Sequence, residues 1–578
     1  MKKIIILFKQ NYLFFITGAF ILFGIFVRYK GLGYSDLQGD EINPLDYLGN
    51  IKGTNPTLTD FIAYLLVQKR GPIQYLINYA NTSLFGYHNE YQVRLPFFIL
   101  GSLALVSFYY FAKKIFDKNA AMWTTVFLAL NGLYITFARI TQYQSFMYFM
   151  VPVSLFVFVK AFKDRNYKLI SISGFLLSLD MLGHYDTLSV LPFICFFVLA
   201  SLYRDKSDFM YILKSGTLFS LFFIIPSILF YVPFLQNSSY ESTTSDYLGR
   251  RIFGGGFMPR TPYVVEKILA MYVPMEGWAF LFLFIVLGLF FLGSNIRENK
   301  IFKYKIPFNL SYLYYFGVSL FSFGIIFSFF PLKPRLSTLI VYVGSILIIL
   351  LLFLSKKVKP VYVGLASWFL FANAFYFFFL RDPRTHVYVV FIPGFILAGY
   401  GLSKFLNYFN SYIKIFFSTL IIIFFIYLSY INWIIYVDKN PEYLWWDKPV
   451  FWSNLYTLQH VRHKKIDGVF GFNHNRDWKI IRDYYDSGCL KGTYNSNEKN
   501  SITKFYMGVD QDNLLTDGMQ LGADTLIGVE APHSWYFYNM ELYKSGYYLL
   551  KTIYKGNYEA VWIWGKVEVY PNGKLLCE

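Results

Sequence analysis

Charged residues are scarce in this chain of 578 residues: they make up 15% of it, whereas hydrophobic residues make up 56%. A soluble domain of this size with so few charges would expose far too much apolar surface to water. Cysteine is scarcer still, and the three cysteines Cys195, Cys489 and Cys577 have none of the spacing that is typical of metal ligands. These shortages argue against a soluble enzyme and a cysteine-built zinc domain, and they favour a membrane protein.

Acidic residues are also few, 35 against 53 basic ones, which gives a formal net charge of +18. A nucleic-acid-binding protein would gather its Lys and Arg on one soluble face beside a recognition element. Here the basic residues occur in short groups between apolar runs, where positive charge orients membrane spans and meets anionic lipid headgroups. We therefore expect membrane lipids as partners and no nucleic acid.

Long apolar runs recur along residues 1–437. A transmembrane helix needs about 20 mostly apolar residues. The first run follows Met1, continues to Val27 and lacks a small-x-small cleavage site, so we interpret it as a retained span and not as a signal peptide. The predicted spans, about thirteen, are near 11–27, 93–112, 120–137, 146–162, 169–183, 187–203, 215–235, 278–293, 308–330, 336–354, 361–380, 385–402 and 413–436. The predicted fold class is thus a polytopic α-helical membrane protein.

The distribution of Lys and Arg tests this count independently, because cytoplasmic loops carry an excess of both. If the N-terminus is cytoplasmic and the spans alternate, every inside loop is basic and the short outside connections carry fewer positive charges. The basic groups of the inside loops lie within 2–9, 113–118, 163–168, 204–214, 297–305, 356–359 and 404–414. The pattern predicts an N-in/C-out topology.

Two long loops and the C-terminal tail then fall outside the cytoplasm. The first loop, residues 28–92, has helical apolar spacing over Leu58 to Leu66 and over Ile73 to Leu84, which is typical of helices lying in the membrane interface. The other loop, residues 236–277, is predicted to be flexible around Gly254 to Gly256 and carries Arg250 and Arg251.

The tail from 438 to 578 is polar and long enough for one domain. We predict a small extracytoplasmic α/β domain, with a strand over Asp467 to Phe472, a helix over Trp478 to Asp486 and a strand over Ala560 to Tyr570. A Cys489–Cys577 disulfide is compatible with that compartment, although nothing in the sequence requires it.

Four short motifs follow one another in the first loop and the span after it. Asp40 and Glu41 come first, and Arg70-Gly71-Pro72, Leu84-Phe85-Gly86 and Arg94-Leu95-Pro96 follow. Two adjacent carboxylates beside a bilayer prefer water, a cation or a proton donor to lipid. In this order the motifs resemble those of the GT-C glycosyltransferases, in particular the glycosyltransferase family 39-like relatives of the protein O-mannosyltransferases and of the aminoarabinose transferase that acts on lipid A.

Further segments extend the resemblance, which is strong over residues 36–205, thinner to residue 402 and absent from the tail. They are Phe137-Ala138-Arg139 with Gln142 and Tyr143, Gly183-His184-Tyr185, and Pro383-Arg384 with Pro393. Many relatives place an Arg where this chain has Gln142. The resemblance implies an integral-membrane glycosyltransferase that takes a hexosyl or pentosyl group from a polyprenyl-phosphate-linked donor on the extracytoplasmic side. The acceptor, a protein, lipid or glycan, is left open.

The chemistry of such a transfer assigns roles to the acidic pair. A base must take the proton of the acceptor hydroxyl, and cationic or N–H donors must stabilise the leaving phosphate. Asp40 is the candidate base and Glu41 the residue that orients it or the acceptor, and one displacement would invert the anomeric carbon. The plainer alternative is that both carboxylates form loop salt bridges with Arg28 or Lys30.

The candidate phosphate-binding residues are Arg139, Arg384, Gln142 and Tyr143 at span ends, with Arg250 and Arg251 in the flexible loop. Arg suits this role because its guanidinium is a permanent cation with a bidentate fork. An arginine at a span end also occurs simply because its long side chain reaches the interface, so this alternative stays open.

His184 and Asp186 lie in the predicted outside turn between the fifth and sixth spans. A neutral imidazole can donate to substrate or bind a metal together with a carboxylate, so a divalent cation is left open as a cofactor. The alternative is a polar cap on a helix end.

Other functions remain to be weighed. Trp445-Trp446-Asp447 is similar to the start of a motif of oligosaccharyltransferases, although Lys448 and Pro449 follow it here, and an aromatic anchor at the membrane interface explains it as well. An oligosaccharyltransferase-like enzyme and a glycan ligase or polymerase are the enzymatic alternatives. A transporter or flippase for a polyprenyl-linked substrate is the non-enzymatic one, but the chain shows no pair of repeats.

Overall fold

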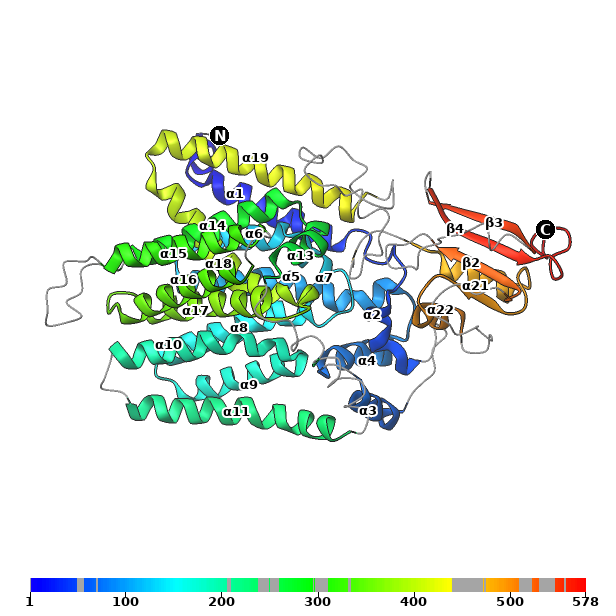
Figure 1. The fold of residues 1–578 in the computed structure, drawn as a ribbon, viewed down its shortest axis with the longest axis horizontal. Helices are drawn as coiled ribbons and strands as arrows, with labels where there is room; N and C mark the ends of the chain where they lie inside the picture. The colour runs from blue at the N-terminus through cyan, green and yellow to red at the C-terminus, as the bar shows by residue number, and fades with distance from the viewer. Residues whose placement is uncertain are drawn as a thin grey trace.

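The computed structural model places a bundle of long helices beside a smaller domain that contains a β-sheet, with short helices between the two (Figure 1). The structure describes residues 2–48, 57–68, 71–204, 209–237, 249, 259–294, 296, 310–330, 334–438, 471, 475–508, 522–529, 546–555 and 558–578. The predicted strand over 467–472, apart from Gly471, and Trp445-Trp446-Asp447 lie outside these residues.

Each predicted span coincides with a helix or a pair of helices. Within the described residues, ten helices are long and apolar enough to cross a membrane. The chain is a polytopic helical membrane protein, while the number of spans and their orientation stay predictions. The bundle helices are α1 (Lys2–Tyr29), α5 (Glu90–Ile115), α6 (Lys118–Leu130) with α7 (Gly132–Phe137), α8 (Gln144–Lys163), α9 (Tyr167–Gly183), α10 (Leu191–Arg204), α11 (Phe209–Gln236), α14 (Met275–Gly293), α15 (Leu310–Phe327), α16 (Pro334–Leu354), α17 (Pro360–Asn373), α18 (Tyr388–Tyr408) and α19 (Ser411–Tyr436).

Side-chain caps define where several of these helices begin. Asn89, Asp117, Asn166 and Asn410 precede α5, α6, α9 and α19, and each accepts a hydrogen bond from the backbone N–H three residues later, at 2.9–3.1 Å. Such caps satisfy N–H groups that the helix itself leaves unpaired. The sequence therefore sets these starts locally, before any packing between helices.

Helix α18 lies in the middle of the bundle and is almost entirely buried between α6, α14 and α17. Aromatic rings fill its contacts: Tyr400 stacks on Phe116 with ring centroids 4.0 Å apart, and Phe391 lies 4.6 Å from Trp278. Three short helical turns close the ends of neighbouring helices. They are η2 (Tyr185–Val190) before α10, η6 (Ala374–Phe379) after α17 and η7 (Arg384–Val387) before α18.

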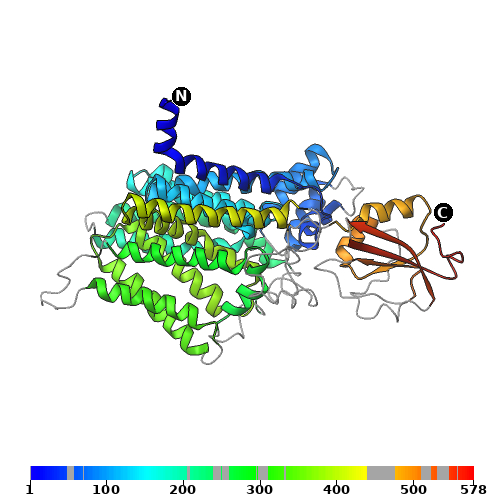
Figure 2. The ribbon, with the colours of Figure 1, turned by 90° about the horizontal axis from the view of Figure 1, so that it is seen from above.

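The first loop folds into short helices at one end of the bundle, between the bundle and the C-terminal domain (Figures 1 and 2). Both predicted helices are present, and Phe61 and Tyr79 join them through stacked rings 4.1 Å apart. Their place at a membrane interface stays a prediction. The elements are α2 (Gly39–Ile42), η1 (Asn43–Leu48), α3 (Leu58–Val67) and α4 (Ile73–Phe85), while α13 (Thr261–Lys267) and η5 (Leu269–Met271) belong to the second long loop.

The C-terminal domain combines two helices with a four-stranded sheet of order β1-β2-β4-β3. β1 pairs with β2 in parallel, and β4 pairs with β2 and β3 in antiparallel fashion. The predicted helix coincides with α21, whereas the predicted last strand is β4, which begins and ends earlier. The elements are α21 (Trp478–Asp486), β1 (Tyr494–Ser496), α22 (Asn500–Met507), β2 (Thr525–Val529), β3 (Tyr547–Lys555) and β4 (Tyr558–Lys566).

The first loop and the C-terminal domain share one hydrophobic core. Leu37 and Ile42 from the loop pack in the same buried cluster as Trp478, Ile481 and Phe505 from the domain. Burial of these side chains stabilises the contact by about 25 cal/mol for each Å² of apolar surface removed from water. The proposed division near residue 438 therefore does not separate two independent cores.

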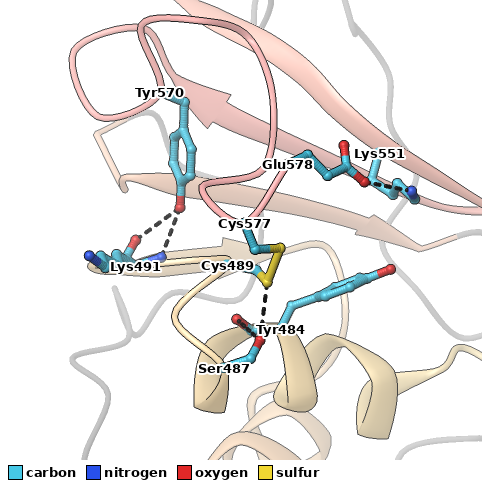
Figure 3. The surroundings of a disulfide bond; sticks show 8 residues. All are labelled: Tyr484, Ser487, Cys489, Lys491, Lys551, Tyr570, Cys577 and Glu578. Atoms are coloured by element: carbon cyan, nitrogen blue, oxygen red, sulfur yellow. Dashed lines mark hydrogen bonds and ion pairs between the residues drawn. A yellow bond between two sulfur atoms is a disulfide. The ribbon is translucent and has the colours of Figure 1, made fainter.

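A disulfide between Cys489 and Cys577 closes the C-terminal domain (Figure 3). It joins the turn after α21 to the last residues of the described chain. Tyr570 supports the same turn, since its hydroxyl accepts a hydrogen bond from Lys491 N at 2.9 Å. Cys195 is not part of a disulfide.

Candidate functional site

Glu41 is held by four hydrogen bonds and is fully buried. Its two carboxylate oxygens accept from Nε and Nη2 of Arg94, both at 2.8 Å, and also from the backbone N–H groups of Gln38 and Thr141, both at 3.1 Å. A bidentate Arg–carboxylate pair of this kind fixes both position and orientation. Glu41 therefore fastens α2 to α5 and to the turn before α8.

Arg94 organises the chain that leads to the acidic pair. Besides Glu41, it donates to the backbone carbonyls of Leu32, Ser35 and Asp36 at 2.8–3.0 Å. The Arg-Leu-Pro motif thus binds the Asp-Glu motif directly. The salt bridge that the sequence suggested, from Glu41 to Arg28 or Lys30, is wrong: Arg28 instead donates to the carbonyls of Gly24, Leu128 and Ala129.

Asp40 precedes Glu41 in α2 and is partly exposed, unlike its neighbour. Gly39, on the other side of Asp40, faces the C-terminal domain: a Cβ there would lie 3.3 Å from Ser501 Oγ and 3.7 Å from Lys499 Cδ. The carboxylate of Asp40 is thus next to a rigidly held residue, at the edge where the first loop meets α22.

The C-terminal domain binds the same loop through hydrogen bonds between Arg476 and the segment around Asp36. Asp36 Oδ2 accepts from Arg476 N at 2.7 Å, and the Arg476 guanidinium also donates to Leu37 O and pairs with Glu498 at 3.1 Å. Burial raises the pKa of Asp36 to about 6, and the positive charge of Arg476 opposes that rise. Arg94 therefore holds both ends of the 32–41 segment, at Leu32 and Glu41, and Arg476 holds its middle, at Asp36 and Leu37.

Arg139 does not present its guanidinium as a phosphate ligand would. It is 3% exposed and donates to the carbonyls of Val27 at 2.5 Å and Lys30 at 2.7 Å, and to Gly471 O at 3.1 Å. Cations are favourable at the carbonyl end of a helix, which here is the end of α1. These hydrogen bonds give Arg139 a structural role, while its contact with a donor phosphate stays a prediction.

Gln142 and Tyr143 follow in the same turn, and both are buried. No hydrogen-bond partner for Gln142 Nε2 is found among the described residues. The Tyr143 ring stacks face to face on His184, with centroids 4.1 Å apart and planes 6° from parallel. The turn that begins with Thr141, a hydrogen-bond partner of Glu41, therefore leads to a second group of polar residues.

That second group contains His184, Asp186 and His386. His184 caps the end of α9, Asp186 lies in η2, and His386 comes from η7, 200 residues after Asp186. Asp186 Oδ2 lies 2.7 Å from His386 Nδ1 and 3.3 Å from His184 Nδ1. The sequence motifs indicated the first two residues but not His386. Two features of the sequence could have indicated His386. Histidine is rare, with seven in the chain, and His386 lies two residues after Arg384 in a predicted outside turn.

Arg384 itself is exposed and lies in η7, with Nε 2.9 Å from Asp382 Oδ2. Its φ angle of 42° is in the left-handed region, which costs energy for a residue with a Cβ. Arg384 is thus at the same end of the bundle as His386, while Arg250 and Arg251 lie outside the described residues.

Gly71 explains why the Arg-Gly-Pro motif needs a glycine. A Cβ at this position would lie 2.1 Å from Leu182 O and 2.9 Å from Gly183 O, so the backbone before α4 touches the end of α9. No other residue allows so close an approach. The motif therefore docks the first loop against the segment that carries His184.

Comparison with known proteins found one family match, over part of the chain. Residues 69–230 match the family model described as dolichyl-phosphate-mannose-protein mannosyltransferase. The match includes the Arg-Leu-Pro motif and His184, and it begins after the acidic pair. It confirms the resemblance to the membrane glycosyltransferases over that segment. No curated protein matches the chain.

A comparison with solved structures found matches of low similarity. The apo oligosaccharyltransferase of Archaeoglobus fulgidus is 13% identical with a TM-score of 0.43, and the match covers 86% of this chain and 64% of that protein. ArnT from Cupriavidus metallidurans bound to undecaprenyl phosphate is 12% identical with a TM-score of 0.41, and the match covers 94% and 97% of the two chains. Similarities at this level do not establish a shared activity, so the relationship rests on the sequence match.

Proposed function

We propose that this chain is a membrane glycosyltransferase that moves a sugar from a polyprenyl-phosphate-linked donor to an acceptor hydroxyl on the extracytoplasmic face. The family match over residues 69–230 supports the donor class, because the description of that family names a dolichyl-phosphate sugar. The nature of the sugar and of the acceptor is not part of the proposal.

The contrast between the two acids carries the proposal. Both oxygens of Glu41 are occupied by Arg94 and by backbone N–H groups, and the residue is fully buried, whereas Asp40 is partly exposed. A fixed neighbour positions Asp40, and the partial exposure of Asp40 leaves it reachable by a substrate, which is what a general base requires. In the proposed reaction Asp40 takes the proton of the acceptor hydroxyl as that oxygen attacks the anomeric carbon. One displacement of this kind inverts the configuration at the anomeric carbon.

The leaving phosphate needs cationic or N–H donors. Arg384 is the arginine best suited to this role, because its side chain is about half exposed (49%) and lies at the same bundle end as His386. Gln142 remains a candidate N–H donor since its Nε2 lacks a partner among the described residues. Arg139 is left out because its donors are occupied by backbone carbonyls.

Two independent observations support the proposed side of the membrane. The basic loops lie between the spans predicted to end in the cytoplasm. The C-terminal domain, which packs against the acidic loop, contains a Cys489–Cys577 disulfide, and disulfides persist mainly in oxidising compartments. Together they support an extracytoplasmic site.

The experiment is an incubation of the full-length protein, purified in detergent and returned to lipid nanodiscs, with a panel of polyprenyl-phosphate sugars. Mass spectrometry follows release of polyprenyl phosphate and transfer of sugar to added acceptors. Asp40→Asn should retain folding and lose at least about a hundredfold in transfer, which is within the range for loss of a general base. Asp164→Asn is the matched control, because Asp164 is exposed in a predicted inside loop.

Two results would contradict the proposal. Wild-type transfer by Asp40→Asn would remove Asp40 as the base. Movement of intact donor between leaflets of a vesicle, with no release of polyprenyl phosphate from any donor, would instead indicate a flippase.

A further inference from the structure

The cluster of His184, Asp186 and His386 is built from two turns at the ends of three bundle helices. Its ligand atoms, one from each residue, all lie within 4.8 Å of one another. Asp186 and His184 are nearly fully buried, and the side chain of His386 is 15% exposed. Two imidazoles and a carboxylate that converge inside a protein provide the nitrogen and oxygen donors that Zn²⁺ and related divalent metals prefer.

His184 Nδ1 lies beside both the backbone amide and the carboxylate of Asp186. Asp186 N–H donates to His184 Nδ1 at 3.1 Å, so Nδ1 acts as an acceptor and carries no proton. The same nitrogen lies 3.3 Å from Asp186 Oδ2. The lone pair of Nδ1 accepts the amide hydrogen bond in this structure, so a metal ion bound at Nδ1 would replace that bond. Donors at about 2.0–2.2 Å from a tetrahedral zinc ion stand about 3.3 Å apart, which matches the His184–Asp186 separation. Asp186 Oδ2 and His386 Nδ1, 2.7 Å apart, are at hydrogen-bond distance and would move apart slightly to bind the same ion.

The charge of Asp186 leads to the same conclusion. Its side chain is 4% exposed, and its only ion-pair partners among the described residues are the two imidazoles. Tyr376 adds a neutral hydroxyl donor at 3.2 Å. A buried carboxylate needs a compensating positive charge. A divalent cation held by the same three residues would supply it.

The surrounding residues hold the cluster in place. Tyr143 stacks on His184, and His184 and His386 face each other with ring centroids 5.2 Å apart. Support of this kind orients metal ligands before the metal binds. The ligands also come from turns that the chain brings together only on folding, so a metal ion there would link η2 to η7.

We propose that His184, Asp186 and His386 bind one divalent transition-metal ion of the Zn²⁺ class. Three protein ligands leave a fourth position of a tetrahedral ion for another ligand. The proposal concerns metal binding and does not depend on the sugar chemistry proposed above, so either can fail without the other.

The test uses the full-length protein in detergent after treatment with a chelator and dialysis. Zn²⁺ is titrated by calorimetry, and Co²⁺ by its visible absorption. The wild type should bind one equivalent of either ion. His386→Gln should bind at least about tenfold more weakly, as even outer-shell changes cost that much at metal sites. His88→Gln, which alters an exposed histidine of the first loop, is the matched control and should bind as the wild type does.

His386→Cys keeps the test decisive if His386→Gln fails to fold. A thiolate is also a zinc ligand, so this variant should regain binding and add a sulfur-to-cobalt charge-transfer band to the Co²⁺ spectrum. Absence of stoichiometric binding to the wild type would overturn the proposal. Wild-type affinity in a folded His386→Gln variant would overturn it as well.

Discussion

Glu41 and Arg94 form a buried ion pair in which both carboxylate oxygens accept from the same guanidinium at 2.8 Å. The pair spans 53 residues and joins the acidic loop to the helix that follows it. It explains why the Asp-Glu and Arg-Leu-Pro motifs occur together, since each is the partner of the other.

Removal of one partner should therefore cost stability. Glu41→Gln leaves the Arg94 guanidinium buried without a counter-charge, and such losses cost about 3–5 kcal/mol. We expect a clearly lower melting temperature, measured by intrinsic tryptophan fluorescence, whereas Asp40→Asn should melt close to the wild type. The double variant Glu41→Gln with Arg94→Met should recover part of the loss, because it removes both charges. Additive effects of the two single changes would show that the ion pair contributes little.

Arg139 and Arg384 should respond in opposite ways to substitution. Arg139→Gln removes charged hydrogen bonds to the end of α1, each worth about 1.5–3 kcal/mol, so it should lower the melting temperature. Arg384→Gln should leave the melting temperature unchanged and weaken use of a polyprenyl-phosphate donor at least about tenfold, seen as a higher KM. Arg335→Gln, another exposed arginine in a predicted outside connection, is the control. If Arg139→Gln melted normally and used donor poorly, the assignments would be reversed.

Gly71→Ala should separate α4 from the end of α9. The added Cβ would lie 2.1 Å from Leu182 O, a backbone atom that cannot move alone. Overpacking of this kind costs about 1–3 kcal/mol, so thermal stability and transfer activity should both fall. Gly216→Ala is the matched control, because nothing lies within 4 Å of its Cβ and alanine favours helix by about 1 kcal/mol. Equal stability of the two variants would argue against the contact.

Reduction of the Cys489–Cys577 disulfide should destabilise the C-terminal domain. The bond closes a loop with a sequence separation of 88 residues, and loss of such a bond typically costs about 2–5 kcal/mol. Cys489→Ser, or treatment with a reductant, should lower the melting temperature and expose the domain to proteolysis. Cys195→Ser should have no such effect, because Cys195 is in no disulfide. A wild type that melts at one temperature with and without reductant would contradict this prediction.

Asp36 should make stability depend on pH. Burial raises the pKa of Asp36 in the folded protein to about 6, above the ordinary pKa of an Asp carboxyl in the unfolded chain. Between these two pKa values the folded protein therefore holds a proton that the unfolded chain has lost. Stability from this group then rises as pH falls through 6, by up to about 1.4 kcal/mol per pH unit. Melting curves should show a gain for the wild type relative to Asp36→Asn between about pH 7.5 and about pH 5. A parallel response of the two proteins would exclude this titration.

Local patterns predicted the helices well. Apolar run length located the bundle helices, and helical spacing located α3 and α4, because both properties depend only on neighbours in the chain. The helix at Trp478 was found for the same reason. The strand β4 was placed too late, because the residues after Lys566 turn instead of pairing with a neighbouring strand.

The candidate site was predicted in part, and the errors have a common cause. Asp40, Glu41, His184 and Asp186 were named from motifs, but the partner of Glu41 and the role of Arg139 were not foreseen. A span-end arginine can face a lipid phosphate or the carbonyls of another helix, and the residue itself looks the same in either case. Only the position of α1 next to Arg139 decides between them.

By itself, the sequence determined that this chain is a membrane protein of many helices, and where those helices begin, because hydrophobic burial and end-capping act over a few neighbouring residues. The tertiary structure decided which polar side chains meet: Arg94 with Glu41, Arg476 with Asp36, and His386 with Asp186. Such contacts join residues from 53 to 440 positions apart. They depend on how the bundle brings the ends of its helices together, which no local pattern contains.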